Sequence, residues 1–164
     1  MEISLEKDEK YMRLAIEEAK LALKADEVPI GAIIVSGGCI VGRGHNLVET
    51  LVDVTAHAEI QAITAASSTI GGKYLNDCTL YVTVEPCPMC AGAIINARVD
   101  RVVYGADDPK AGSCGSLTDL FAVPYNHSPK VERGVLEERC AAVLRDFFKK
   151  LREKNQNGKD LSKK

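Results

Sequence analysis

Two cysteines near the middle of the chain have the spacing of a metal site. Cys87 and Cys90 are three positions apart in the stretch Pro-Cys-Pro-Met-Cys, so at the start of a helix their sulfur atoms would lie on one face, about one turn apart. A pair of this kind also fits a redox centre or half of a zinc ribbon, but the chain has no second C-x-x-C. Zinc in proteins is almost always four-coordinate. The pair therefore needs a further ligand from elsewhere in the chain.

The tripeptide His57-Ala58-Glu59 can supply that ligand and a proton carrier. On a helix Glu59 points away from His57 and need not bind the same ion. Three protein ligands leave one position for water, which is the arrangement of a catalytic zinc. Zinc lowers the pKa of such a water toward 7, and a neighbouring carboxylate can move its proton. The sequence thus predicts Zn²⁺ bound by His57, Cys87 and Cys90, with Glu59 as the proton shuttle.

The combination of H-x-E with a later P-C-x-x-C resembles the signature of the zinc-dependent base deaminases. In that chemistry water adds to the ring carbon that bears the amino group, and ammonia leaves. Backbone N–H groups at the two helix starts, near Ala58 and Cys87, could support the tetrahedral intermediate. The remaining cysteines have no metal-like spacing, and we interpret them as core or loop residues: Cys39, Cys78, Cys114 and Cys140.

Helix and strand patterns place these motifs where strands lead into helices. Gly37-Gly38 between two β-rich runs predicts a hairpin, and Pro88 suits a first helical turn because its missing N–H would have no partner there. A surface loop, with one helical turn near 117–121, is expected over residues 107–129. The expected helices are 7–25, 57–67, 88–97 and about 136–151, and the expected strands are 29–35, 39–44, 79–84, 101–105 and about 131–135.

This order predicts an α/β protein with a three-layer α/β/α architecture around a mixed central sheet of about five strands. In such sheets sites form at the carboxyl ends of strands, where helix N-termini converge. The helix starts near His57 and Cys87 are therefore expected to meet.

Length and composition limit the classes of protein to which the chain can belong. With 164 residues, 46% of them hydrophobic and 27% charged, the chain is long enough for one globular domain. It contains no apolar run of about 18 residues that could span a membrane, and its N-terminus is not a secretion signal. We expect a cytoplasmic protein with no membrane contact, consisting of a deaminase domain at 1–152 and a basic, flexible tail at 153–164.

The charge is unevenly distributed. Residues 149–164 hold seven Lys or Arg and two acidic residues, while the rest of the chain holds 14 basic and 21 acidic ones. An acidic body with a basic end is compatible with a polyanionic partner at that end. A solvated, fraying C-terminus explains the same pattern.

Six stretches of the chain together resemble the bacterial tRNA-specific adenosine deaminases, a family of the cytidine-deaminase-like superfamily, over roughly residues 5–152. They are Val28–Val35, Gly44–Asn46, Thr55–Ile60, Leu80–Ala93, Arg101–Ala106 and Gly115–Asp119. The resemblance implies the zinc ligands and proton shuttle given above. It also implies a homodimer that converts the wobble adenosine of an arginine tRNA anticodon to inosine.

The same resemblance implies substrate contacts. Asn46 would hydrogen-bond the target nucleotide, although it also suits the end of a hairpin strand. Val28, Pro29 and Ile30 would line an apolar slot for the flipped base, or pack as an ordinary strand start. Asp107 and Asp108 would lie near the anticodon, where sugar hydroxyls or base edges suit an acid better than phosphate; they also suit a turn.

Two departures from the family pattern affect the RNA-binding side rather than the zinc site. Val54 stands where many relatives have proline, and residues 65–73 lack the arginines of the family's helix end.

A deaminase of a free base such as guanine or cytosine remains an alternative, because it would use the same motifs. A non-catalytic zinc-stabilised binding module is a further alternative, although structural zinc is normally closed by four protein ligands.

Overall fold

Two glycines close the hairpin on which the sheet is built. The computed structural model, which describes residues 2–161 and the side chains of residues 4–159, pairs β1 (Gly31–Ser36) with β2 (Cys39–His45) in antiparallel orientation. Gly37 and Gly38 between them have φ angles of 56° and 80°, which glycine adopts without strain and which a two-residue type I′ turn requires. The predicted hairpin is confirmed.

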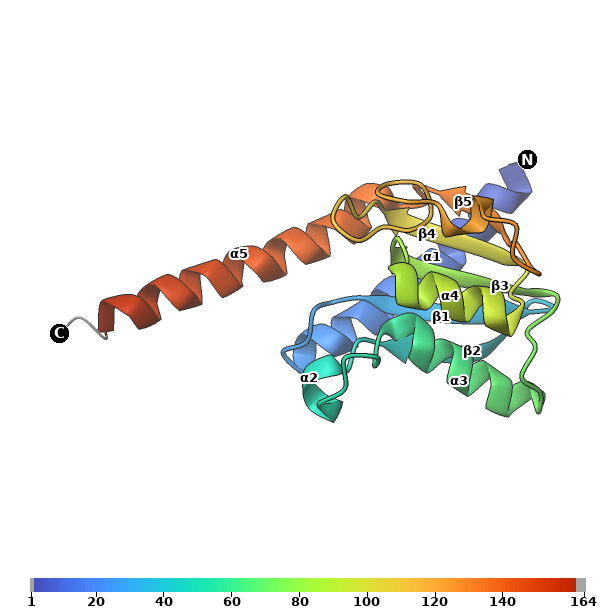
Figure 1. Cartoon of the computed structure of the whole chain (residues 1–164). Coiled ribbons are helices and arrows are strands. Elements are labelled where there is room, and N and C mark those ends of the chain that lie inside the picture. Colours follow the sequence, from blue (N-terminus) through green and yellow to red (C-terminus); the bar gives the residue numbers. More distant parts are fainter. Residues whose placement is uncertain (1, 162–164) are drawn as a thin grey trace.

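The remaining strands extend the hairpin into a mixed sheet. β3 (Cys78–Val84) pairs antiparallel with β1, whereas β4 (Arg101–Ala106) and β5 (Lys130–Arg133) follow in parallel, so the strand order is β2-β1-β3-β4-β5. Parallel neighbours need a crossover connection, and α4 (Pro88–Ala97) makes it between β3 and β4. The five-stranded mixed sheet is the one that the sequence predicts (Figure 1).

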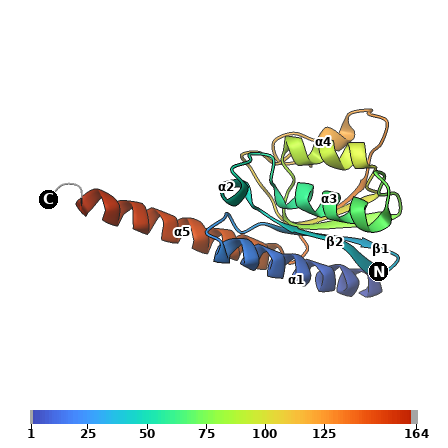
Figure 2. The same ribbon diagram turned by 90° about the horizontal axis from the view of Figure 1, so that it is seen from below.

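Helices cover both faces of this sheet. α3 (Ala58–Ile70) and α4 lie on one face, while α1 (Glu2–Lys24) and the first part of α5 (Glu137–Leu161) lie on the other, as Figure 2 shows. Side chains along a strand alternate between the faces. Ala32 and Ile34 accordingly belong to the core under α3 and α4, and Ile33 and Val35 to the core under α1. The three-layer α/β/α prediction is confirmed.

Glycines in β2 set the distance between the sheet and α3. A Cβ atom on Gly42 would clash with the backbone carbonyl of Ala62, and one on Gly44 with that of Ala58. Since only hydrogen fits at these positions, α3 packs with its backbone against the strand. The N-terminus of α3, which carries His57 and Glu59, is held close to the sheet in this way.

Some segments differ from the expected ranges. A short helix, α2 (Val48–Leu51), follows β2 where no element was expected, and the turn near residues 117–121 is a 3₁₀ helix, η1 (Leu120–Ala122). Residues 153–161, expected to be a flexible tail, continue α5 as helix, and residues 162–164 of that tail lie outside the described residues. No helix in the described part of the chain is long and apolar enough to cross a membrane.

Candidate active site

The starts of α3 and α4 bring three possible metal ligands together. His57 is the N-cap of α3 and Cys87 the N-cap of α4, with Pro88 in the first turn, as predicted, and Cys90 one turn further along. His57 Nδ1 lies 3.6 Å from the sulfur of Cys87 and 3.5 Å from that of Cys90. All three ligand atoms are within 4.8 Å of one another. The cluster could therefore hold one metal ion.

The three groups polarise one another. The thiol of Cys90 and the ring of His57 hydrogen-bond to the sulfur of Cys87 and lower the pKa of Cys87 to about 4. The same contact, together with burial, raises the pKa of Cys90. The hydrogen bond to Cys87 raises the pKa of His57. The site is built to hold negative charge on sulfur, which is what a cation needs.

Glu59 is buried beside this cluster, in the first turn of α3, and is only 4% exposed. Burial, with a smaller contribution from the negative charge of Cys87, raises the pKa of Glu59 above its ordinary value. A carboxyl group with a raised pKa holds a proton more readily than an ordinary glutamate, which suits a group that must both take up and release one. Its environment therefore suits the predicted proton shuttle.

A cavity of about 560 Å³ opens onto these residues, a size typical of small-molecule sites. Three groups of residues account for much of its wall: the motif residues, the segments on either side of the hairpin, and the apolar side of α5. They contribute, in that order, His57, Ala58, Glu59 and Cys87; Val28, Ile30 and Asn46; and Phe147, Phe148 and Leu151. The predicted residues Val28, Asn46 and Ala58 thus line one cavity with His57 and Cys87, while Cys90 is buried behind them.

Asn46 is oriented by its own neighbours. Its side-chain Nδ2 donates to the carbonyl of Val28 at 3.3 Å, and its Oδ1 accepts from the N–H of Val48 at 3.1 Å. These bonds serve the turn after β2, and an amide retains a second hydrogen and a second lone pair for a ligand. The turn role and the ligand role that the sequence leaves open are therefore compatible.

The two predicted aspartates of the loop after β4 differ in their position relative to the cavity. Asp108 lines the cavity, and its Oδ1 accepts from the backbone N–H groups of Lys110 and Ala111, which closes its own turn. Asp107 and Pro29 do not line the cavity. The carboxylate of Asp107 instead accepts from the guanidinium of Arg133 at 2.8 Å. Substrate contact by Asp107, Asp108 and Pro29 stays a prediction.

Sequence reasoning missed two buried carboxylates in the cavity wall, Glu27 and Glu85. Glu27 accepts the backbone N–H groups of Glu49 and Thr50 and thereby holds the start of α2. Glu85, just before Cys87, accepts several N–H groups from the loop that follows β4. Both glutamates bind backbone atoms far away in the chain, so no local pattern could reveal them.

Comparison with known proteins relates this arrangement to deaminases. The MafB19-like deaminase family matches residues 6–152. A tRNA-specific adenosine deaminase of Bacillus subtilis (strain 168) is 50% identical over 150 residues, which cover 91% of this chain and 93% of the relative.

Solved structures also show that the chain is similar to deaminases. One, described in a study of A-to-I editing by tRNA:A34 deaminases at the wobble position of transfer RNA, superimposes with a TM-score of 0.80 at 46% identity, covering 82% of this chain and 99% of the other. A guanine deaminase from Bacillus subtilis superimposes with a TM-score of 0.60 at 42% identity, covering 69% of this chain and 72% of the other.

Proposed function

Since the chain belongs to the MafB19-like deaminases and, among them, to the family of tRNA-specific adenosine deaminases, we propose that it converts adenosine to inosine at the wobble position of a tRNA anticodon. The observation that carries the proposal is a single cavity that joins His57, Cys87, a buried Glu59 and the amide of Asn46. The net reaction adds water to the adenine ring and releases ammonia.

Zinc is the cofactor that fits the ligand set, held by His57 Nδ1 and the sulfurs of Cys87 and Cys90. In a tetrahedral site with Zn–N of about 2.05 Å and Zn–S of about 2.3 Å, nitrogen and sulfur are about 3.6 Å apart, and the two measured separations are 3.6 and 3.5 Å. Two thiolates and one imidazole also match the soft-to-borderline ligands that zinc prefers. When bound, zinc supplies a water molecule that is nucleophilic at neutral pH.

Glu59 carries the protons of the reaction. Its carboxylate accepts a proton from the attacking water and donates it to N1 of the adenine ring. It then takes the proton of the new C6 hydroxyl and passes it to the amino group, so that the C–N bond breaks, ammonia rather than an amide anion departs and the C6 carbonyl forms. The burial of Glu59 keeps bulk water from competing for these protons. One group thus serves both the addition and the departure step.

Other residues of the cavity hold the base. The amide of Asn46 would read a polar edge of the purine, and Val28 and Ile30 would flank its faces. The N–H groups at the start of α3, near Ala58, would donate to the oxygen that is added to the reacting carbon. Phe147 and Phe148 of α5 add aromatic surface at the rim, which suits stacking with unpaired bases of an RNA loop.

We further propose a homodimer and a cytoplasmic location, where tRNA is found. The exposed side chains of Leu51, Val52 and Val54 give the segment between α2 and α3 an apolar surface, and such surface commonly marks a contact with another protein chain. Sedimentation analysis at several concentrations tests this; a monomer throughout contradicts it.

The substrate is tested by incubating the protein with anticodon stem-loops and sequencing them, because inosine is read as guanosine. The expected result is a single A-to-G change at the wobble position. A guanine deaminase is the second candidate, favoured by the 42% identity of the solved relative. Ammonia release from free guanine or cytosine, together with an unchanged RNA, would select that alternative.

A further inference from the structure

The loop after β4 folds around one buried carboxylate. Glu85, 3% exposed at the end of β3, receives four hydrogen bonds from residues 108–116. Its Oε1 accepts from the N–H of Asp108 at 3.2 Å and from the hydroxyl of Ser116. Its Oε2 accepts from the N–H groups of Cys114 at 3.0 Å and Ser116 at 3.1 Å. Each oxygen therefore has two donors.

This arrangement requires a carboxylate. An ionised carboxylate has about four lone-pair positions and no hydrogen to donate, so it matches four donors. An amide of the same shape would offer one oxygen and would turn its own N–H groups toward two of the donors. Gly112 shows how tightly the loop is wrapped, because a Cβ atom there would clash with the carboxylate of Glu85.

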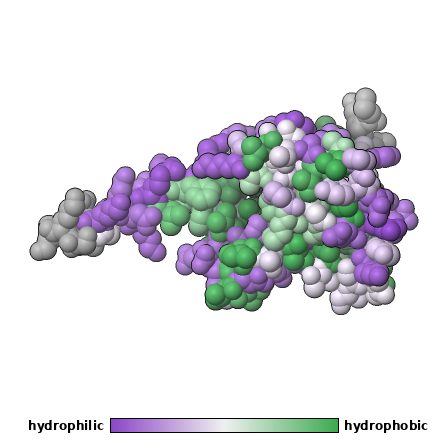
Figure 3. Space-filling view, in the orientation of Figure 1, coloured by the Kyte–Doolittle hydropathy of each residue, from purple (hydrophilic) through white to green (hydrophobic). Residues whose placement is uncertain are grey.

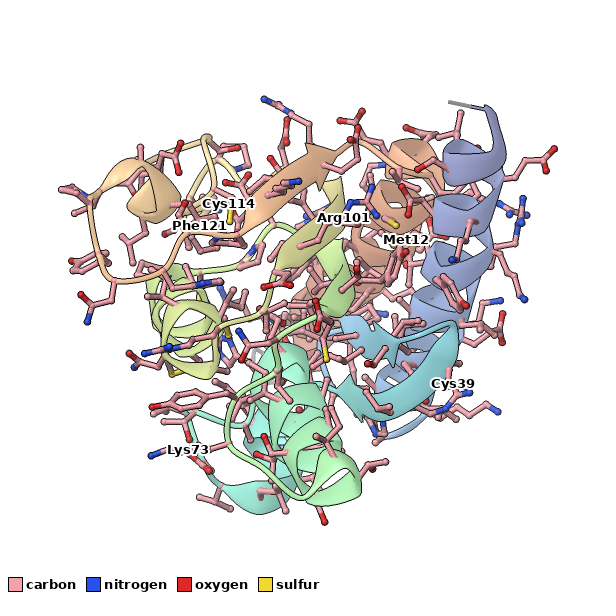
Figure 4. The ribbon with its side chains drawn as sticks, turned by 90° about the vertical axis from the view of Figure 1, so that its right-hand side faces the viewer. Met12, Cys39, Lys73, Arg101, Cys114 and Phe121 are labelled. Carbon is pink, nitrogen blue, oxygen red and sulfur yellow. The ribbon has the colours of Figure 1, made fainter. Side chains whose placement is uncertain are left out.

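The wrapped loop forms part of the cavity wall. Asp108 and Ala111 line the cavity, and the N–H of Ser113 donates to the carbonyl of Pro86 at 2.9 Å, directly before Cys87. The side chains of Cys114, within the loop, and Phe121, just after it, lie close together (Figure 4), and both belong to the core under α4. Between residues 107 and 119 the structure has no helix or strand. Backbone hydrogen bonds within the loop and a bridge between Cys114 and Asp119 shape it, and Glu85 joins the shaped loop to the end of β3.

We propose that Glu85 is a positioning residue for the deamination reaction, which holds the loop of residues 108–116 so that its wall of the cavity fits the nucleotides beside the target base. This rests on the proposed function. All four acceptor positions of Glu85 are occupied by the protein, so it does not exchange protons with substrate. Its effect is on how the RNA is bound.

The test is Glu85→Gln in the zinc-loaded enzyme, acting on an anticodon stem-loop. The expected result is a rise in KM that lowers kcat/KM by up to about 100-fold, the scale of a misplacement of about 1 Å. We expect kcat to change by less than about threefold, because the group that moves protons is untouched. In hydrogen-exchange measurements the amides of Asp108, Cys114 and Ser116 should lose protection, while zinc content stays at the parent value.

Ser116→Ala, which removes one of the four bonds, should shift KM and amide protection in the same direction by less. Asp8→Asn is the matched control: it alters another buried carboxylate, bound to Arg101 and Tyr81 under α1, and should leave KM unchanged. Unchanged amide protection and KM in Glu85→Gln would overturn the proposal, as would an equal KM shift in Asp8→Asn. Hydrogen exchange needs no RNA. It therefore shows whether Glu85 holds the loop even if the parent protein leaves RNA unmodified and the proposed function fails.

Discussion

Glu59 and Glu85 are both buried and line the same cavity, but their environments shift their pKa values in opposite directions. Burial raises the pKa of Glu59. Burial also acts to raise the pKa of Glu85, but the hydroxyl of Ser116 and the N–H groups of Cys114, Ser116 and Asp108 outweigh it, so the pKa of Glu85 is lowered. A group that must pick up a proton needs the first environment, and a fixed anionic anchor needs the second. The division of roles therefore follows from the hydrogen-bond donors around each carboxylate.

Glu59→Gln should retain zinc and the folded structure but lose deamination. General acid–base catalysis contributes about 10²–10⁴-fold, and because Glu59 serves more than one proton transfer, we expect a loss at the upper end of this range. Single-turnover deamination of an anticodon stem-loop measures it. Glu132→Gln, on the exposed strand β5, is the control and should retain parent activity. Activity of Glu59→Gln within about tenfold of the parent would assign the proton transfer to another group.

Cys87→Ala should lose the metal. Two remaining ligands bind zinc much less tightly than three, and metal binding contributes to folding stability, so the variant should also unfold at a lower temperature. Zinc per chain, measured by elemental analysis after dialysis against a mild chelator, gives the answer. Cys39→Ala, which removes an exposed cysteine far from the cluster, should retain the metal. Equal zinc in both variants would contradict the proposed ligand set.

At the scale of elements, an ion pair between the buried Asp8 and the partly exposed Arg101 fixes α1 to the sheet. Asp8 of α1 accepts from both Nη atoms of Arg101 at the start of β4, at 2.8 and 2.6 Å, and from the hydroxyl of Tyr81 on β3 at 2.8 Å. Figure 4 shows Arg101 on the side of the sheet that α1 covers. Burial acts to raise the pKa of Asp8, but the hydrogen bonds from Arg101 and Tyr81 outweigh it and lower the pKa.

This contact should make stability depend on pH. Because the pKa of Asp8 is lower in the folded than in the unfolded protein, where it is near 3.8, the contact stabilises fully above that value and is lost as the pH falls through the folded pKa. Asp8→Asn should reduce the free energy of unfolding by about 1–3 kcal/mol near pH 7. In urea unfolding from about pH 7 to about pH 3, the difference from the parent should shrink. A constant difference would exclude the ion pair as its cause.

Most elements could be predicted because their signals are local. Gly37-Gly38 determines the hairpin, Pro88 marks the start of α4, and the H-x-E and P-C-x-x-C spacings identify the ligand cluster. Each of these depends on residues a few positions apart.

What could not be predicted depends on contacts across the sequence. α2 is held by Glu27, more than 20 positions before it, and its four residues show no periodicity of their own. The apolar positions of α5 end near Leu151, so no pattern in the sequence indicates that the helix continues to Leu161. The role of Glu85 depends on the folded loop that surrounds it.

At the scale of the whole molecule, α5 extends beyond the body of the protein (Figure 1). Figure 3 shows hydrophilic surface along its outer part and apolar surface where it meets the body. The middle of α5, with the apolar residues Phe148 and Leu151, borders the cavity. A second hollow beside it is lined by Lys110, Arg145, Lys149 and Arg152, among others. Positive charge is thus concentrated beside the proposed RNA site.

Removal of residues 153–164 should weaken RNA binding without abolishing chemistry. The truncation removes all four basic residues of the tail but retains Leu151 and Arg152 at the site. Fewer counterions are then released on association, and the salt dependence of affinity becomes shallower. Fluorescence anisotropy with an anticodon stem-loop at several salt concentrations measures this. A double variant of α1, Lys10→Gln with Lys20→Gln, is the control. Unchanged affinity and salt slope would mean that the tail takes no part in binding RNA.

The order of the strands also has a consequence for the time course of folding. β1 and β2 are joined by two residues, whereas β3 pairs with β1 across a long stretch of chain, Ala32 with Val82, and such non-local contacts form slowly. α3, with His57 as its N-cap, packs on the hairpin, while Cys87 and Cys90 stand at the start of α4, directly after β3. The three ligands therefore meet only when β3 has paired with the hairpin, so a metal ion binds after this slow step and does not nucleate folding.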